Sequence, residues 1–274
     1  LPSLKSHIMK TLVYKLLLSL YMSKLISQNL VPNYSFEVRS SCPNGVGGIS
    51  LHFATSWDGW DSADYFSSCS TDSQYSVPQN IAGYQQAFTD TSYAGILLYV
   101  PTTNPVSSEF IQVQLIDSLA KAHYYCVSFY VNLADSSNYA IQNFGAYFSE
   151  NAITLAEIEN GSFIPQIENF ADSMLNDKVN WKEISGYYYA NGGEKFLTIG
   201  NFYNNANTVS QYIGGASSFY NVAYYFIDDV SVVQCDSLFT SINNITALAE
   251  NQIRLYPNPN AGNITLEYQL SESE

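Results

Sequence analysis

The closing β-strand of this chain is predicted at Tyr224–Val233, which reads Tyr-Tyr-Phe-Ile-Asp-Asp-Val-Ser-Val-Val. Aromatic and β-branched residues without Gly or Pro are typical of strands. The apolar alternation slips by one residue within the stretch, because Ile227 lies on one face of the strand and Val230 lies on the other. One extra residue in a strand is a β-bulge, so a bulge is expected at Asp228-Asp229. These two carboxylates repel each other unless a cation or a hydrogen-bond donor lies between them.

Eight segments upstream have the short, regular apolar spacing of antiparallel strands. They are residues 81–88, 93–100, 109–115, 124–133, 144–149, 163–167, 181–190 and 195–202. Pro165 places the sixth segment at a sheet edge, and the sequence Asn-Gly-Gly-Glu at 191–194 predicts a hairpin between the last two. Residues 151–160 are expected to form a brief helical turn or a loop. The pattern predicts an all-β fold, an antiparallel jelly-roll β-sandwich.

Residues 40–76 are predicted to form one long loop, because turn formers are dense and regular alternation is absent. A long loop inside a compact domain needs a link that holds it. Cys42 and Cys69 flank this loop, so a disulfide between them is the preferred pairing, worth about 3 kcal/mol on a chain-entropy model. Cys126 is interpreted as a buried free thiol, and pairing with Cys235 is the alternative.

The composition is that of a secreted β-protein. Aromatic residues make up 15 % of the 274 residues and charged residues only 12 %, whereas disordered chains are poor in aromatics. The formal net charge is −14. Phosphates are repelled by an acidic surface, so nucleic acid is excluded as an expected partner.

Two stretches at the ends of the predicted sandwich resemble the ends of a galactose-binding-like jelly roll, the fold of family 4, 9 and 22 carbohydrate-binding modules. They are Asn29–Glu37, which reads Asn-Leu-Val-Pro-Asn-Tyr-Ser-Phe-Glu, and the Tyr-Phe-Ile-Asp-Asp-Val-Ser-Val of Tyr225–Val232. The resemblance implies that the first and last strands lie together around a structural calcium ion, with Glu37 and Asp228 or Asp229 as ligands. Oxygen ligands suit calcium. The alternative is that Glu37 caps a turn and the Asp pair is solvated.

The region 29–235 also resembles a recurrent extracellular module of Bacteroidota proteins. The motifs that carry this resemblance lie at residues 64–66, 77–85, 93–95, 109–115, 125–135 and 191–202. The module has no settled activity to transfer to this chain. The predicted jelly-roll domain spans residues 28–235.

Five aromatic residues are candidates for ligand binding, because exposed aromatic rings stack on the apolar faces of sugar rings. Trp57 and Trp60 lie in the long predicted loop, and Tyr187, Tyr188 and Tyr189 lie in a predicted strand. For the two tryptophans a second interpretation is favoured, in which they form the loop's own small core against the sheet.

Residues 1–27 are interpreted as upstream residues and a secretory signal peptide. Lys10 and Lys15 precede a short apolar run at residues 16–22, and a small residue lies before the expected cleavage site at Gln28. The run is too short to span a bilayer. The mature chain is therefore expected to be secreted and to contain no integral membrane segment.

A linker is predicted at residues 236–250, and the sequence after it resembles the start of a C-terminal sorting domain of type IX secretion cargo. The motif is Leu-Tyr-Pro-Asn-Pro at 255–259, followed by Gly262. The resemblance implies a small β-sandwich at 251–274, passage through the type IX secretion machinery, and display on the cell surface or release. Such domains extend several tens of residues further, so 251–274 is expected to be truncated.

Catalytic motifs of the common hydrolases are absent from the sequence, which contains neither G-x-S-x-G nor H-E-x-x-H. Carboxylates for glycoside hydrolysis meet only in space, and no motif selects a pair from Asp64, Glu109, Asp135, Glu183 and Glu194. The expected function is a non-catalytic module that binds a polysaccharide or glycoconjugate. Two alternatives stay open, which are a structural or adhesion module that contacts protein or matrix and an uncharacterised glycan-active hydrolase.

Overall fold

The computed structural model describes residues 28–44, 51–60, 63–101, 108–160, 163–170, 173–214, 221–236, 254–256 and 265–267. The chain divides into two compact units, which are Leu1–Gln234 and Cys235–Glu274. In the second unit, β15 (Arg254–Tyr256) pairs antiparallel with β16 (Thr265–Glu267). The predicted signal peptide, linker and Leu-Tyr-Pro-Asn-Pro motif fall largely outside the described residues. Within the described part, no helix has the length and apolar character needed to cross a membrane.

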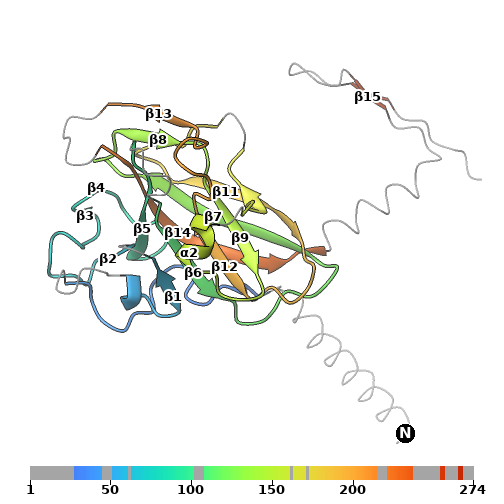
Figure 1. The fold of residues 1–274 in the computed structure, drawn as a ribbon, viewed down its shortest axis with the longest axis horizontal. Coiled ribbons are helices and arrows are strands. Elements are labelled where there is room, and N and C mark those ends of the chain that lie inside the picture. The colour runs from blue at the N-terminus through green and yellow to red at the C-terminus, as the bar shows by residue number, and fades with distance from the viewer. Residues whose placement is uncertain are drawn as a thin grey trace, which may run out of the picture. The chain divides into compact units, whose positions relative to one another are not determined.

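Two five-stranded antiparallel sheets form the first unit (Figure 1). Sheet 1 has the order β1 (Trp57–Gly59), β6 (Phe110–Gln114), β12 (Phe196–Gly200), β9 (Gly145–Ser149) and β10 (Ile167–Glu168). Sheet 2 has the order β11 (Lys182–Tyr189), β7 (Tyr124–Leu133), β14 (Ala223–Gln234), β5 (Ser92–Tyr99) and β2 (Asp64–Ser67). Smaller elements are η1 (Leu51–Phe53), β3 (Gln79–Asn80), β4 (Gly83–Tyr84), β8 (Tyr139–Ile141), α2 (Leu155–Asn160) and β13 (Ser210–Tyr212). The all-β antiparallel sandwich is as predicted.

The hydrophobic core lies between the inner faces of the two sheets. On β7, Val127 and Phe129 are buried and alternate with half-buried neighbours, as the period of a strand requires. Phe148 of sheet 1 stacks on Tyr188 of sheet 2, with ring centroids 4.8 Å apart and planes 8° apart. This contact shows that alternate residues of β9 and β11 meet across the core.

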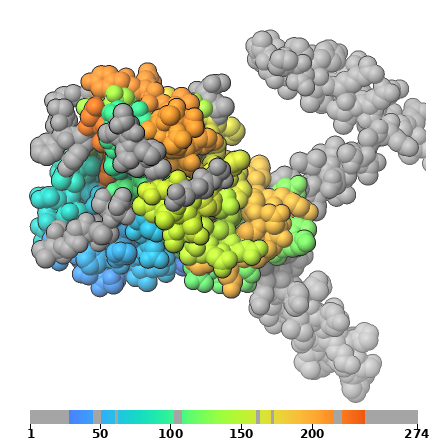
Figure 2. All heavy atoms as spheres, viewed as in Figure 1, coloured from blue at the N-terminus to red at the C-terminus, as the bar shows by residue number. Residues whose placement is uncertain are grey.

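A short helix covers part of the outer face of sheet 1. Thr154 and Glu157 form a capping box at its start, because the Glu157 carboxylate accepts the Thr154 N–H at 2.7 Å and Glu157 N–H donates to Thr154 Oγ1 at 3.3 Å. Ile158 of α2 packs in one apolar cluster with Phe110 of β6. In the space-filling view, yellow-green residues that include α2 cover the middle of the near face (Figure 2).

The predicted bulge in the closing strand is confirmed. Residues Asp228–Ser231 of β14 oppose only Ser128–Tyr130 of β7, so β14 carries one extra residue. Asp229 takes the left-handed conformation, with a φ of 50°. Ile227 and Val230 are consequently both buried, although their positions differ in parity.

The opening segment lies against this same strand, as the resemblance to galactose-binding-like jelly rolls implied. Leu30 N–H donates to the Val232 carbonyl at 2.8 Å, and Val230 N–H donates to the Tyr34 carbonyl at 2.9 Å. Strand β5 pairs with β14 only as far as Ile227. Residues 30–34 therefore form hydrogen bonds with the part of the β14 edge that β5 does not pair with.

Three predictions of local structure are wrong. Residues 40–76 are not only loop, because they contain β1 and β2 at the edges of the two sheets. Residues 81–88 do not form one strand, because Ile81 and Ala82 form the turn between β3 and β4 and the strand ends at Tyr84. Residues 191–194 do not close a hairpin, because β11 belongs to sheet 2 and β12 to sheet 1.

The predicted disulfide between Cys42 and Cys69 is confirmed. Cys126 and Cys235 are disulfide-bonded as well, so the free-thiol interpretation of Cys126 is wrong. Its side chain is half-buried on the outer face of β7 rather than enclosed in the core. The four cysteines are thus all oxidised, which is a state that persists in oxidising compartments.

Candidate functional site

Two different surfaces make up the outer face of sheet 2. One part is covered by residues 75–88, which pack on Phe66, Tyr93 and Phe226 in a second apolar cluster. The other part, over β11, β7 and the end of β14, is an open groove of 680 Å³. The residues that matter for its chemistry are Ser128, Glu168, Phe170, Glu183, Ser185 and Tyr187.

Exposed aromatic rings and hydroxyl groups line this open groove. Tyr187 is 62 % exposed and Phe170 is 75 % exposed, although large apolar rings usually avoid water. Ser185 and Ser128 face each other across β11 and β7. Among the described residues that line the groove there is no Lys or Arg, and its charged groups are carboxylates.

Glu168 is held in place at the groove by two neighbours. Its carboxylate accepts a hydrogen bond from Asn143 Nδ2 at 3.3 Å and another from the Tyr203 hydroxyl at 3.1 Å. Burial raises the pKa of Tyr203, and the Glu168 charge raises it further. The phenol therefore stays protonated as the donor, and the carboxylate keeps a defined orientation.

The three predicted tyrosines of β11 divide between the two faces of sheet 2. Tyr187 and Tyr189 point outward, and the Tyr189 ring packs on Tyr124 at 4.8 Å. Tyr188 points inward and is buried against Phe148. Successive residues of a strand face opposite sides, so only the two outer rings can meet a ligand.

The two predicted tryptophans pack against residues from other parts of the chain. Trp57 is 2 % exposed, stacks on Phe36 at 4.8 Å, and donates its ring N–H to the Asn33 carbonyl at 3.0 Å. Trp60 is half-buried with its ring against Phe110 at 6.2 Å. Both rings are therefore packing residues rather than exposed ones, but they do not form a core of the loop's own, because Trp57 lies in the main core between the sheets and Trp60 in the separate cluster of Phe110.

The predicted calcium ligands lie on two sides of a short loop at residues 89–91. Glu37 accepts the Thr91 N–H at 2.9 Å and the Thr91 hydroxyl at 2.7 Å. Asp228 accepts the Thr89 N–H at 2.8 Å and the Asp229 N–H at 2.7 Å. The structure therefore brings Glu37 and Asp228 to one loop, although 190 residues separate them in the chain.

Burial dominates the electrostatics of this acidic site. It raises the pKa of Asp228 to about 8, against the lowering effect of the hydrogen bonds from Thr89 and Asp229. It also raises the pKa of Asp229. A cation would favour the charged carboxylates, and oxygen is the donor that calcium takes. In the described part of the chain no three His, Cys, Asp or Glu side chains form a metal cluster, so the predicted set of Glu37, Asp228 and Asp229 is not assembled as a whole. A calcium ion held by two of them would need main-chain carbonyls or water to complete its shell.

Sequence reasoning did not identify Phe170, Glu168 or Ser128 as candidate site residues. Phe170 follows β10 outside any regular element, and Ser128 is an ordinary outward position of a strand. These residues come together at the groove only because β10 packs beside β11. Neither the apolar periodicity nor a short motif in the sequence predicts that packing.

Comparison with known proteins gives structural likeness only. No protein-family model matches the chain, and no curated protein matches it. The CBM22-1 xylan-binding domain from Paenibacillus barcinonensis has 16 % identity and a TM-score of 0.40, over 76 % of this chain and 95 % of that one. A cleaved adhesin domain of Lys-gingipain from Porphyromonas gingivalis has 15 % identity and a TM-score of 0.37, over 72 % and 94 %.

A third similar structure is TmCBM61 in complex with beta-1,4-galactotriose. It has 14 % identity and a TM-score of 0.34, over 76 % of this chain and all of that one. The function proposed below rests on the residues of this chain rather than on these likenesses.

Proposed function

We propose that this protein is a non-catalytic, glycan-binding module whose binding site is the open groove of sheet 2. The observation that carries the proposal is the pair of exposed rings, Tyr187 and Phe170, beside the hydroxyl groups of Ser128 and Ser185. A sugar ring can contact both kinds of group. Its C–H faces stack on aromatic rings, and its hydroxyls form hydrogen bonds with donors and acceptors. Glu168 supplies an acceptor of defined direction.

We further propose that the module acts outside the cell. Two disulfides favour an oxidising compartment. Passage through the type IX secretion machinery and display at the cell surface rest on the sequence at 255–262 and stay predictions.

A calcium ion held by Glu37 and by Asp228 or Asp229, with main-chain carbonyls or water in the rest of its shell, is the third part of the proposal. The buried Asp228 carboxylate and the bulge at Asp229 support it. When bound, the ion would neutralise carboxylates that are costly to ionise without a partner. Its role would be structural, because the opening segment, the 89–91 loop and the closing strand meet at these residues.

The test of the groove is a binding screen of the full chain against soluble polysaccharides, by isothermal titration calorimetry. Binding is expected to weaken about tenfold in Tyr187→Ala and in Phe170→Ala, which corresponds to about 1.4 kcal/mol. Tyr84→Ala is the matched control, because Tyr84 is 54 % exposed on β4 and lies outside the groove. Unchanged affinity in both groove variants would refute the site. A broad panel without any binding would favour the alternative of an adhesion module.

A further inference from the structure

A row of three serines crosses the open groove of sheet 2. Ser185 of β11 and Ser231 of β14 both lie opposite Ser128 of β7, so the row spans three neighbouring strands. All three residues line the groove and are half-buried. Neighbouring strands are about 4.8 Å apart, so the row presents one hydroxyl group at each step of that length.

The hydroxyl groups of this row are available to a ligand. Within the described part of the chain, the Oγ atoms of Ser128, Ser185 and Ser231 form no hydrogen bond with the protein, and none of them is sealed from solvent. A hydroxyl group both donates and accepts, and it carries no charge. The row therefore matches the hydroxyl groups of a sugar chain.

Two carboxylates flank the serine row. Glu183 lies two residues before Ser185 on the same face of β11, which places it about 7 Å along the strand. Glu168 of β10 also lines the groove, where Asn143 and Tyr203 donate to it. Both donors to Glu168 are neutral groups, so they orient its negative charge without cancelling it.

The charge of Glu183 acts along the outer face of sheet 2. Glu183 lies opposite Tyr130 of β7. Burial raises the pKa of Tyr130, and the charges of Glu183 and Asp229 raise it further. Lys182, the cation next to Glu183 in the sequence, pairs instead with Asp177 at 3.3 Å. Among the described residues of the groove lining there is no Lys or Arg, so no cation of the lining offsets the two carboxylates.

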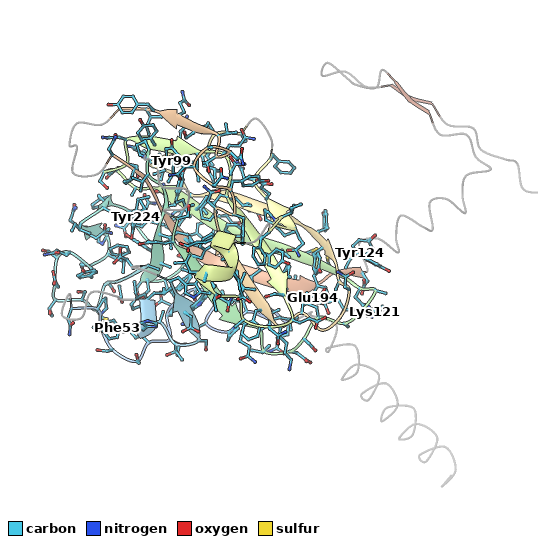
Figure 3. The ribbon with its side chains drawn as sticks, in the orientation of Figure 1. Phe53, Tyr99, Lys121, Tyr124, Glu194 and Tyr224 are labelled. Carbon is cyan, nitrogen blue, oxygen red and sulfur yellow. A yellow bond between two sulfur atoms is a disulfide. The ribbon has the colours of Figure 1, made fainter. Side chains whose placement is uncertain are left out.

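The groove has an acidic side and an aromatic side. Phe88, the last residue of the segment that covers the rest of sheet 2, stacks on Tyr130 with ring centroids 3.7 Å apart and planes 17° apart. At the other end of β7, Tyr124 lies at the rim of the domain (Figure 3). A ligand between these ends meets Glu183 on one side of the serine row and the exposed ring of Tyr187 on the other.

We propose that the groove selects an uncharged polysaccharide and excludes chains that carry carboxylate or sulfate groups, with Glu168 and Glu183 as the residues that set this selectivity. The inference rests on the proposed glycan-binding function and names the class of glycan. Ser231 extends the contact to β14, beyond the rings of Tyr187 and Phe170. An anionic group in the groove would meet two like charges at short range, and such a juxtaposition opposes binding.

The first test uses polysaccharides that share a backbone and differ in charge. Isothermal titration calorimetry on the full chain would compare hydroxyethylcellulose with carboxymethylcellulose, galactan with polygalacturonate, and linear xylan with glucuronoxylan, at neutral pH without added divalent cations. In each pair that binds, the neutral member is expected to bind about tenfold more tightly or better. An acidic member that binds as tightly as its neutral partner would overturn the selectivity. Absence of binding to every polysaccharide would instead overturn the glycan-binding function itself.

The second test separates the groove from the charge of the whole protein, because a net charge of −14 by itself repels an acidic chain. Glu168→Gln and Glu183→Gln are each expected to strengthen binding of the acidic polysaccharides about fivefold relative to their neutral partners. Asp58→Asn makes the same change of net charge at a carboxylate that is 80 % exposed on β1, and it is expected to leave this ratio unchanged. Equal effects of the three substitutions would refute the role of the two groove carboxylates.

The third test examines the serine row with the neutral polysaccharides. Ser231→Ala is expected to weaken their binding about fivefold, which is the size of one neutral hydrogen bond. Ser210→Ala is the matched control, because Ser210 is a half-buried strand serine on β13 that lies outside the groove. A thermal melt would establish that each variant is folded. A folded Ser231→Ala variant with unchanged affinity would refute the contact with β14.

Discussion

The hydroxyl of Tyr188, on β11 of sheet 2, donates a 2.6 Å hydrogen bond to Oε1 of Glu194, which lies just before β12 of sheet 1. Glu194 also accepts the N–H groups of Asn191 and Gly192, both at 2.9 Å. One buried carboxylate therefore organises residues 191–194, within the six-residue connection that carries the chain from one sheet to the other. These hydrogen bonds explain why a sequence typical of hairpin turns instead connects a strand of sheet 2 with a strand of sheet 1.

Removal of the Tyr188 hydroxyl is expected to destabilise the domain. Burial by itself would raise the pKa of Glu194, but the hydrogen bonds from Tyr188 and the backbone outweigh it and the pKa is lowered. Tyr188→Phe therefore takes a donor from a buried charged group, at a cost of about 1.5–3 kcal/mol in the free energy of unfolding. Urea unfolding measures the change. Tyr187→Phe, one residue away and exposed, is the control, and equal effects of the two substitutions would disprove this role.

Acid sensitivity is expected from Asp177, which precedes β11. Hydrogen bonds from the backbone of Asn180 and Val179, from the Asn180 side chain and from Lys182 lower its pKa to about 2, against the effect of burial. Because its pKa is lower in the folded state, Asp177 stabilises the fold fully at pH values above its unfolded-state pKa, which is near 4. This stabilisation is lost as the pH falls through about 2. The contribution is at most about 2 kcal/mol.

The measurement for Asp177 is urea unfolding between pH 5 and pH 2. The wild-type protein is expected to lose more stability over this range than Asp177→Asn, which has no carboxylate to protonate. Asp58→Asn serves as the exposed comparison. Parallel curves for wild type and Asp177→Asn would show that the hydrogen bonds at Asp177 do not stabilise the fold.

Gly95 is expected to be intolerant of a side chain. A Cβ at this position would collide with the Tyr224 hydroxyl and approach the Phe66 ring to 2.7 Å. Overpacking of this kind costs about 1–3 kcal/mol, so Gly95→Ala is expected to lower the melting temperature. Gly186→Ala is the control, because its new Cβ meets only the Ile167 side chain, at 3.1 Å. A melting temperature unaffected by Gly95→Ala would mean that β2, β5 and β14 pack more loosely than the structure indicates.

Calcium is expected to raise the melting temperature of the chelator-treated protein. At a calcium concentration one hundred times the dissociation constant the gain is about 2.7 kcal/mol, or roughly 5–10 °C for a domain of this size. The gain should disappear in Glu37→Gln and in Asp228→Asn and persist in Asp58→Asn. Melting curves that coincide with chelator and with calcium would eliminate the metal proposal.

Much of the local structure was predictable, because the alternation of apolar residues along a strand is itself local. Six predicted strands match β5, β6, β7, β9, β11 and β12 to within one or two residues. The apolar residues change from odd to even positions between Ile227 and Val230, and this change located the bulge. The disulfide of Cys42 and Cys69 followed from the loop that they flank.

The choice of partners for each strand was decided only by the tertiary structure. Alternation shows which residues share a face, but it does not show which sheet a strand joins, and for this reason β11 and β12 were wrongly paired. The same limit applies to the sites. Asp64 and Tyr224 are 160 residues apart, and neither lies in a motif that names the other. Their hydrogen bond, like the groove between Phe170 and Tyr187, exists because separate strands pack together.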